Sequence, residues 1–183
     1  MNALRGLLVL MLLPLLAACS SIWVGTPETT PRFALPPAAL GQEVTLAQRL
    51  RFSYLGVARS MDAALEVDAD NVRLAALLGG QTVLSLDWNG KKLDVRKAEW
   101  VPEAMDAAQV LSDLQFVFWP SRALQESLPA GWQIVDSAQR RELRQGTRVV
   151  ISADYTGQGI SASHVHLERT DFSYSLDIDS SLQ

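Results

Sequence analysis

Cysteine and histidine, the residues that most often carry disulfides, thiol chemistry and metal ions, are almost missing from this sequence. It has one cysteine, Cys19, and two histidines, His164 and His166. One cysteine cannot form an intrachain disulfide, so burial of apolar side chains must stabilise the folded part. The histidines alternate with Glu168 on one predicted strand, a geometry that suits metal ligands, but no cysteine and no H-E-x-x-H helix joins them. We therefore favour a solvent-facing pair.

Motifs of common enzyme classes are missing as well. The sequence contains no G-x-S-x-G around a nucleophilic serine, and its Gly79-Gly80 pair predicts a turn rather than a phosphate-binding loop. The formal net charge of −4 argues against nucleic acid as a partner. These absences predict a protein that is not an enzyme and holds no metal. A periplasmic hydrolase using His164 stays as a weaker alternative.

The N-terminal residues have the pattern of a bacterial lipoprotein signal. Arg5 precedes an uncharged apolar run that ends at Ala18. This run is too short to span a membrane, because a spanning helix needs about 20 apolar residues. The last three residues of the run and the cysteine that follows, Leu-Ala-Ala-Cys, match the lipobox, so we expect a signal peptide over residues 1–18 and lipid attachment at Cys19. Several acyl chains hold a protein on a membrane much more firmly than one. A plain cleaved signal is the alternative.

Residues 19–40 form the next unit, a proline-rich tether. The segment holds four of the eight prolines, Pro27, Pro31, Pro36 and Pro37, and shows no sustained period. Such a chain is semi-extended, at about 3 Å per residue. Ser20 stands where an aspartate retains lipoproteins in the inner membrane of enteric bacteria, so we expect the outer membrane, on its periplasmic face. The alternative is a strand-like wrap over the domain, using the apolar side chains of Ile22, Trp23, Phe33 and Leu35.

The remaining residues, 41–183, have the size of one domain and show mainly a period of two. Alternation around Leu84 and Leu86, followed by Asn89-Gly90, predicts a hairpin with a type I′ turn. The pattern predicts strands at 46–55, 59–68, 71–78, 82–88, 93–95, 132–136, 140–145, 147–155, 163–169 and 173–179. Antiparallel sheet therefore makes up most of the domain.

A helical period interrupts the strands between Pro102 and Gly131. Met105, Ala108 and Leu111 follow one another at three-residue steps, and Pro102 fits the first turn of the helix. Pro120 ends this helix, and Ser121 is the expected cap of a second one. The order is about five strands, two helices and about four strands. One curved sheet that holds both helices against its concave side buries every apolar stripe.

These stretches together resemble the LolA/LolB superfamily of periplasmic and outer-membrane lipoprotein carriers. The resemblance is strongest to a LolB-like outer-membrane lipoprotein family often associated with aryl-polyene gene clusters. It rests on the ordered set NVRLAALLGGQTVLSLDWNGKKLDVRK, PEAMDAAQVLSDLQFVFWPSRALQESLPAGWQI, RELRQGTRVVISADY and HVHLERTDFSYSLDI. It implies a mainly β (α+β) fold, an unclosed antiparallel half-barrel of about eleven strands with short helices in its concave face.

The resemblance also implies a hydrophobic cavity between sheet and helices that receives acyl chains. An apolar helix face inside an incompletely closed sheet forms such a concave site. The alternative is that the same side chains form a solid core. The candidate lining residues are Leu84, Leu86, Met105, Leu111, Leu114, Phe116, Phe118, Trp119, Trp132 and Ile134.

A rim loop is the second candidate site. In LolB-type proteins a leucine on a protruding loop between strands assists insertion of cargo into the membrane, and Leu78 falls at the matching place with Leu77 beside it. The following glycines allow a turn with positive φ. The sequence lacks the proline that precedes the leucine in that family. Two buried strand-end leucines are the alternative.

The one basic cluster consists of Arg140, Arg141, Arg144 and Arg148. A solvated strand face partly neutralised by Glu142 is the simplest interpretation. As a docking patch, the cluster would meet an acidic soluble carrier protein, where complementary charge raises the rate of encounter, or anionic lipid headgroups.

The expected function is that of an outer-membrane-anchored lipoprotein, a monomer, that binds a lipid or acylated molecule and assists its transfer to the outer membrane. The resemblance implies aryl-polyene lipid or lipoprotein as cargo. No cofactor is expected apart from the covalent N-terminal lipid and a bound acyl chain. The alternative is a structural or assembly lipoprotein that docks a partner protein through its rim.

Overall fold

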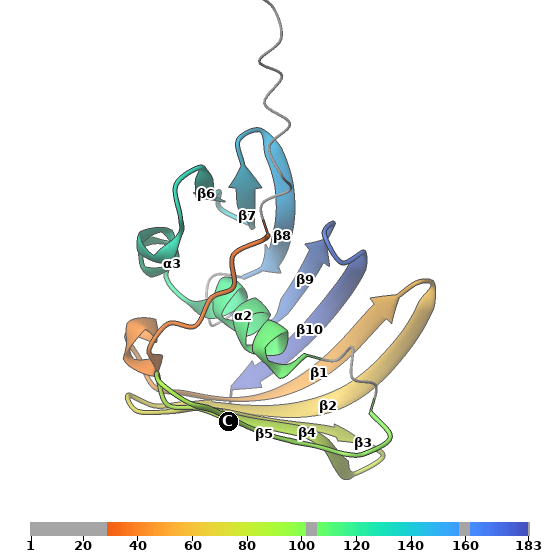
Figure 1. Cartoon of the computed structure of the whole chain (residues 1–183). Coiled ribbons are helices and arrows are strands. Elements are labelled where there is room, and N and C mark those ends of the chain that lie inside the picture. Colours follow the sequence, from red (N-terminus) through yellow and green to blue (C-terminus); the bar gives the residue numbers. More distant parts are fainter. Residues whose placement is uncertain (1–28, 102–105, 158–161, 183) are drawn as a thin grey trace, which may run out of the picture.

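The fold is a single curved antiparallel sheet with helices in its hollow (Figure 1). The structure, a computed structural model, describes residues 29–101, 106–157 and 162–182. A short 3-10 helix, η2 (Pro37–Leu40), precedes the first strand. The other elements in chain order are β1 (Val44–Tyr54), β2 (Val57–Val67), β3 (Val72–Leu78), β4 (Gln81–Trp88), β5 (Leu93–Lys97), α2 (Ala107–Phe118), α3 (Ser121–Ser127), β6 (Trp132–Asp136), β7 (Arg140–Gln145), β8 (Arg148–Thr156), β9 (His164–Arg169) and β10 (Tyr174–Leu182).

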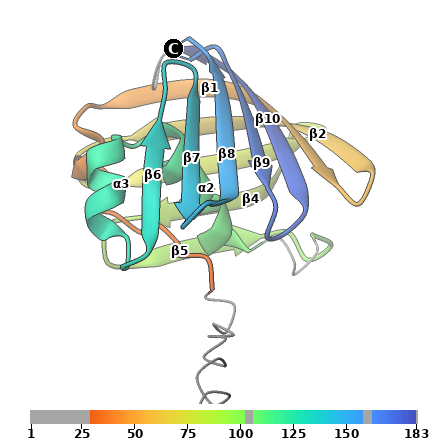
Figure 2. The same cartoon turned by 90° about the horizontal axis from the view of Figure 1, so that it is seen from above.

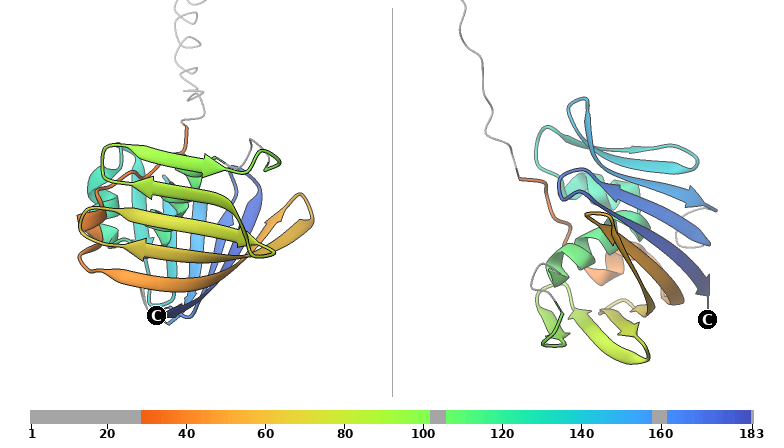
Figure 3. Two further views of the ribbon diagram at one scale, coloured as in Figure 1. Left: turned by 90° about the horizontal axis from the view of Figure 1, so that it is seen from below. Right: turned by 90° about the vertical axis from the view of Figure 1, so that its right-hand side faces the viewer.

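The sheet curls without closing. Its strand order is β5-β4-β3-β2-β1-β10-β9-β8-β7-β6, so β5 and β6 are its edges. Seen from above, β6 to β10 run across the direction of β1 to β5, and the side view shows the open arc around α2 (Figures 2 and 3). The predicted mainly β, open half-barrel with short helices is therefore confirmed. The described residues form ten strands rather than about eleven, with five and not four after the helices.

Period-two alternation places the strands, because alternate side chains face the core. In β3, Val72, Leu74 and Ala76 are buried while the residues between them are partly exposed. The predicted turn at Asn89-Gly90 is wrong in type. Only the glycine has a positive φ, and a four-residue loop follows Trp88, in which the Asn89 side chain accepts the N–H groups of the next two lysines. A type I′ turn needs positive φ at both central residues.

Both predicted helices are present, but both predicted starts are wrong. Helix α2 begins at Ala107, because the Asp106 carboxylate accepts the backbone N–H of Ala108 at 2.9 Å and caps the first turn. Pro102, the expected start, lies outside the described residues. In α3, Ser121 is the first helical residue and not the cap. Its hydroxyl bonds the Asp136 carboxylate instead.

Helix α2 lies in the hollow of the sheet, with ten of its twelve residues buried. The N-terminal residues 30–40, which we call the strap, pack along it (orange in Figure 1). Phe33 is buried and stacks on Phe116 with 6.2 Å between ring centroids. The described part of the expected tether therefore packs on the domain, as the wrap alternative proposed. Ile22 and Trp23 lie outside the described residues. None of the helices in the described ranges is long and apolar enough to cross a membrane.

The sheet's inner face predicts where substitution is costly. Leu167 in β9 is completely buried, whereas Leu182 at the end of β10 is 66% exposed. We expect Leu167→Ala to lower the free energy of unfolding by about 2 to 5 kcal/mol, because it removes buried methyl groups and leaves a cavity. Leu182→Ala should change it by less than about 0.5 kcal/mol. Urea denaturation of both variants measures this, and equal effects would contradict the burial assigned to Leu167.

Candidate functional site

One end of the sheet, which we call the rim, collects four of its turns. Antiparallel pairing places the β1–β2, β3–β4, β7–β8 and β9–β10 turns at the same end. Strand β5 also ends there, because Lys97 pairs with Leu84 near the start of β4. The rim therefore carries segments from all parts of the chain.

The rim carries most of the exposed large apolar side chains of the described residues. Six of the nine lie in its turns or the residues beside them, and Val95, Val135 and Leu182 lie elsewhere. The six are Tyr54, Leu55, Val57, Leu78, Trp100 and Phe172. Exposed apolar side chains gathered at one place mark interaction surfaces more often than scattered ones do.

Leu55 is the most exposed of these side chains, at 75%. It occupies the left-handed region with φ 48°, and Gly56 follows with φ 78°, so this two-residue loop has the positive φ values of a type I′ turn. Asparagine and glycine adopt this conformation at little cost, whereas leucine does not. Backbone strain of this kind collects at functional sites. The turn thus displays a leucine at the expense of stability.

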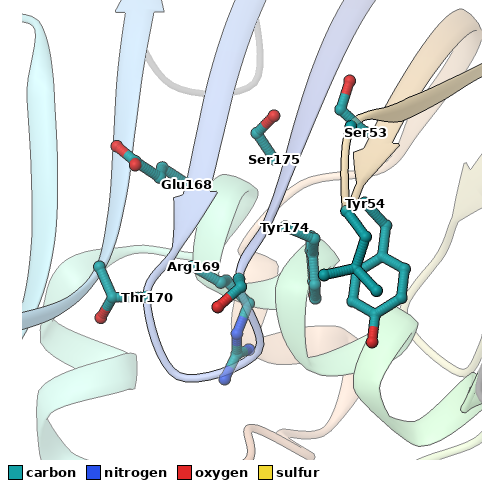
Figure 4. Close-up of a pocket in the computed structure, with 10 residues that line it drawn as sticks. Ser53, Tyr54, Glu168, Arg169, Thr170, Tyr174 and Ser175 are labelled. Carbon is teal, nitrogen blue, oxygen red and sulfur yellow. The ribbon is translucent and has the colours of Figure 1, made fainter.

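A groove of about 480 Å³ opens between the β1–β2 and β9–β10 hairpins (Figure 4). Apolar and polar side chains both line it, and Tyr54 and Tyr174 stand on paired positions of neighbouring strands. The Phe52 ring lies against the Tyr174 ring, with 5.2 Å between the ring centroids. The lining residues are Ser53, Tyr54, Leu55, Gly56, Glu168, Arg169, Thr170, Ser173, Tyr174 and Ser175.

A buried polar network lies beneath this groove. Arg169 is only 1% exposed, and its guanidinium donates to Asp113 at 2.5 Å and to Asp171 at 2.6 and 3.0 Å. The Tyr174 hydroxyl donates to the other Asp113 oxygen, and the Gln109 amide donates to Asp113 at 2.9 Å. The network ties α2 to the two strands that form one wall of the groove.

Burial sets the protonation of these groups. It raises the pKa of the Asp113 carboxyl and of the Tyr174 hydroxyl, because both charged forms lose solvation. Burial also acts to raise the pKa of Asp171, but hydrogen bonds and charge from Arg169 outweigh it, so that pKa is lowered. Two carboxylates thus accept three hydrogen bonds from one buried arginine and balance its charge within the fold.

Arg141 fixes the other end of α2. Its guanidinium donates to the carbonyl oxygens of Phe116 and Trp119 at 2.7 and 2.8 Å, and it pairs with Asp136 at 2.9 Å. The Tyr155 hydroxyl donates to the Val117 carbonyl at 2.9 Å. These carbonyls close the helix and have no partner within it, and a cation there suits the helix dipole. Helix α2 is thus attached to the sheet at its middle, through Asp113, and at its C-terminal end.

The predicted cavity residues come together, but in a packed core. Leu84, Leu86, Leu111, Leu114, Phe116, Phe118, Trp119 and Trp132 are buried between α2 and the sheet, and Ile134 packs against them partly buried. Met105 and the lipid-attachment residue Cys19 lie outside the described residues. The use of these residues as a ligand cavity stays a prediction. At the rim, Leu78 is exposed beside Gly79 and Gly80, and Leu77 is half-buried.

Three of the four arginines of the predicted docking patch have partners within the fold. Arg140 pairs with Glu142 and Asp154, Arg144 pairs with Glu142, and Arg141 holds α2 as described. Hydrogen bonds from Arg140 lower the pKa of Glu142. Arg148, at the rim, makes no salt bridge with any described residue, so its charge is the one available for docking in this cluster.

The two histidines lie on the outer face of the sheet. His164 and His166 contact Asp179 and Asp177 across β9 and β10, with Nδ1–oxygen distances of 2.8 and 2.6 Å. Within residues 29–101, 106–157 and 162–182, no three side chains of the metal-binding types gather closely enough to hold an ion.

Sequence reasoning missed the Asp113–Arg169 pair. A signal was present, because Arg169 follows Val165 and Leu167 at an inward position of β9. A charged residue on an inward face requires a buried partner. The partner lies 56 residues earlier in the chain, and no local pattern reports that separation.

A comparison with known families completes the description. A family model described as "Protein of unknown function (DUF3261)" matches residues 45–182. The chain belongs to this family. The DUF3261 match covers every strand and both α-helices but not the strap, so the half-barrel is the unit that the family shares. A search of curated proteins gives no match.

Tyr155 predicts how stability depends on alkaline pH. Burial raises its pKa to about 12, from an ordinary value of 10.0. Above pH 10 the unfolded chain loses this proton while the folded protein keeps it. The contribution of Tyr155 to the free energy of unfolding is therefore complete below pH 10. It falls as the pH rises toward 12, by up to about 1.4 kcal/mol per pH unit.

Tyr155→Phe removes this contribution. We expect the difference in free energy of unfolding between wild type and Tyr155→Phe, from urea denaturation, to be constant from pH 7 to 9. Between pH 10 and 11 it should decrease by about 1 kcal/mol. A difference that stays constant up to pH 11 would contradict the buried, hydrogen-bonded hydroxyl at the end of α2.

Proposed function

We propose that this chain is an outer-membrane lipoprotein, anchored at Cys19 on the periplasmic face, that binds a lipid or acylated molecule and assists its transfer to the membrane. The observation that carries the proposal is the apolar rim, which gathers six exposed apolar side chains at one end of an open half-barrel. The sequence resemblance to LolB-like carriers supports it, since those proteins share the open half-barrel with helices inside.

The position of the chain's N-terminal segment supports an orientation in which the rim faces the membrane. The Thr30 hydroxyl bonds the Asp171 carboxylate in the β9–β10 turn, so the strap begins at the rim. Cys19 stands eleven residues before Thr30, which is at most about 40 Å of extended chain. A lipid anchor at Cys19 would therefore keep the rim, rather than the opposite end of the sheet, near the bilayer.

Charge around the rim suits a bilayer with anionic headgroups. Arg59 and Arg148 lie beside the β1–β2 and β7–β8 turns and make no salt bridge within the described residues. Each arginine near an anionic surface adds about 1 kcal/mol of attraction. Leu78 takes the part of the membrane-entering leucine of LolB-type proteins, and Leu55, Trp100 and Phe172 lie at the same end of the sheet.

Transfer in this proposal is passive and needs no catalysis. Cargo moves from a donor, such as a soluble periplasmic carrier protein, to a stronger apolar site here and then to the bilayer. Aryl-polyene lipid, or another acylated envelope component such as a lipoprotein, fits the resemblance. The protein would work as a monomer, with no cofactor apart from its own covalent lipid.

One observation favours a second candidate function. Seven of the ten residues expected to line the cavity are buried in one core, and Leu84 is buried in a second cluster, as they would be in a protein that carries nothing. The chain would then be a structural or assembly lipoprotein that docks a partner protein through the same rim. The two candidates differ in whether the protein takes up an acyl chain.

The rim predicts binding to vesicles. In the chain with Cys19→Ser, so that no anchor contributes, Leu55→Asp and Phe172→Asp should each weaken co-sedimentation with vesicles of phosphatidylethanolamine and phosphatidylglycerol by roughly tenfold or more. Each change removes a side chain whose burial in lipid contributes about 1.5 to 3 kcal/mol. Leu182 lies at the opposite end, and its 66% exposure falls between those of Phe172 and Leu55, so Leu182→Asp is the control and should bind as the parent does. Equal weakening by all three would exclude the rim as the contact surface.

Uptake of lipid tests the function itself. We expect native mass spectrometry of the Cys19→Ser protein, purified from its native host, to show bound lipid, and extraction to identify it. The purified protein should also accelerate the movement of a fluorescent fatty acid between vesicles. A protein that is empty and takes up no fatty acid would contradict the carrier proposal and favour the docking alternative.

A further inference from the structure

The strap fills a slot on the open side of the half-barrel. Phe33, 2% exposed, lies on Phe116 of α2, and Leu35 packs partly buried against the same core. The strap contains Pro31, Pro36 and Pro37, which have no N–H group to give to a sheet edge. Side chains, rather than a neighbouring strand, therefore hold it in the slot.

The slot contains a binding site for one carbonyl group. The carbonyl oxygen of Leu35 accepts the Trp88 indole N–H at 2.8 Å and the Gln115 amide N–H at 2.9 Å. The Gln115 carbonyl oxygen accepts the Leu35 N–H at 2.8 Å, and the Ser112 hydroxyl accepts the Phe33 N–H at 3.0 Å. Ser112 and Gln115 are completely buried. Two buried donors thus converge on one acceptor oxygen beside an apolar surface.

These two donors suit any carbonyl oxygen and not only that of a peptide. An ester, amide or carboxyl group at the head of a hydrocarbon chain presents the same acceptor. A bound acyl chain would take the place of the Phe33 and Leu35 side chains. A hydrocarbon without a carbonyl would leave both donors buried and unpaired, which is costly.

We propose that the slot under the strap is the acyl-binding site, and that the strap is its own-chain occupant, which an acyl ligand displaces. This inference rests on the proposed function and adds to it the location of the site and the group that is recognised. The strap begins at the rim, where Thr30 bonds Asp171, so its path leads from the expected membrane surface to the slot. Displacement would free the strap without breaking the sheet.

A matched pair of ligands tests the carbonyl site. The probes are 1-monododecanoylglycerol, an ester, and 1-O-dodecylglycerol, the ether that lacks only the carbonyl oxygen. Their affinities for the full mature chain with Cys19→Ser are measured by displacement of fluorescent cis-parinaric acid. We expect the ester to bind roughly tenfold or more tightly than the ether, since a lost hydrogen bond to a buried donor commonly changes affinity by this factor.

Variants separate the donors from general effects on folding. Gln115→Met keeps the side-chain volume but removes one donor, and it should reduce the ester preference by roughly tenfold. Trp88→Phe removes the other donor and provides a second variant if the first fails to fold. Gln125→Met is the matched control. The Gln125 amide also donates to one backbone carbonyl, that of Trp132, and accepts one backbone N–H, that of Ile134, but these bonds join α3 to β6 away from the strap. This variant should keep the full preference.

Cleavage by trypsin measures whether the strap has left the slot. Arg32 is exposed, and the bond after it leads into buried Phe33. The ester should increase cleavage after Arg32 severalfold, and Phe33→Ala should do so without ligand. Equal binding of ester and ether with a protected strap would overturn this inference and leave the carrier function standing. Binding of neither probe, even by Phe33→Ala, would overturn the carrier function itself.

Discussion

The fold depends on the burial of a helix that is not apolar throughout. Helix α2 lies within the hollow of the sheet, and four of its buried residues are polar: Gln109, Ser112, Asp113 and Gln115. A buried polar group is costly unless it is hydrogen-bonded. Gln109 bonds Asp113 within the helix, while Ser112, Asp113 and Gln115 bond other parts of the chain, and the positions of those partners decide what surrounds the helix.

Two faces of α2 select two different neighbours. Asp113 holds Arg169 and Tyr174, and through them the β9–β10 hairpin, at a sequence separation of about 60 residues. Ser112 and Gln115 hold the strap, about 80 residues earlier. The rim and the strap are thus both positioned by adjacent residues of one helix. A shift of α2 would disturb both, which links the surface of the molecule to its interior.

The sequence pattern predicted local structure well and distant contacts poorly. Alternation of apolar and polar residues located all ten strands, because one face of a strand packs on the core and the other faces water. The helix starts were missed, since Asp106 caps α2 and since Pro120, with no side-chain cap bond, is the N-cap position of α3. The type I′ geometry appeared at Leu55–Gly56, where no favoured dipeptide stands. Periodicity says which residues face inward, but it does not say which of them meet.

The same limit applies to the candidate site. The apolar residues of the predicted cavity could be named because each follows a helical or strand period, and they do gather around α2. The pair of N–H donors from Trp88 and Gln115 could not be named, because it joins a strand and a helix to the strap. Residues of the rim other than Leu77 and Leu78 were missed for a similar reason. Leu55, Trp100 and Phe172 come to the same end of the sheet only through the order of the strands.

That order also constrains how the chain can fold. Strands β1 to β5 form one run of sequential neighbours and β6 to β10 form another, and the two runs join only where β1 pairs with β10. The pairing of Leu46 with Leu182 is therefore the most distant in the sheet, and it lies at the sheet's centre rather than at an edge. Each half can form from local contacts, but loop-closure entropy delays their union. Because synthesis runs from the N-terminus to the C-terminus, β10 is made after the other nine described strands, and it is the strand that joins the two halves of the sheet.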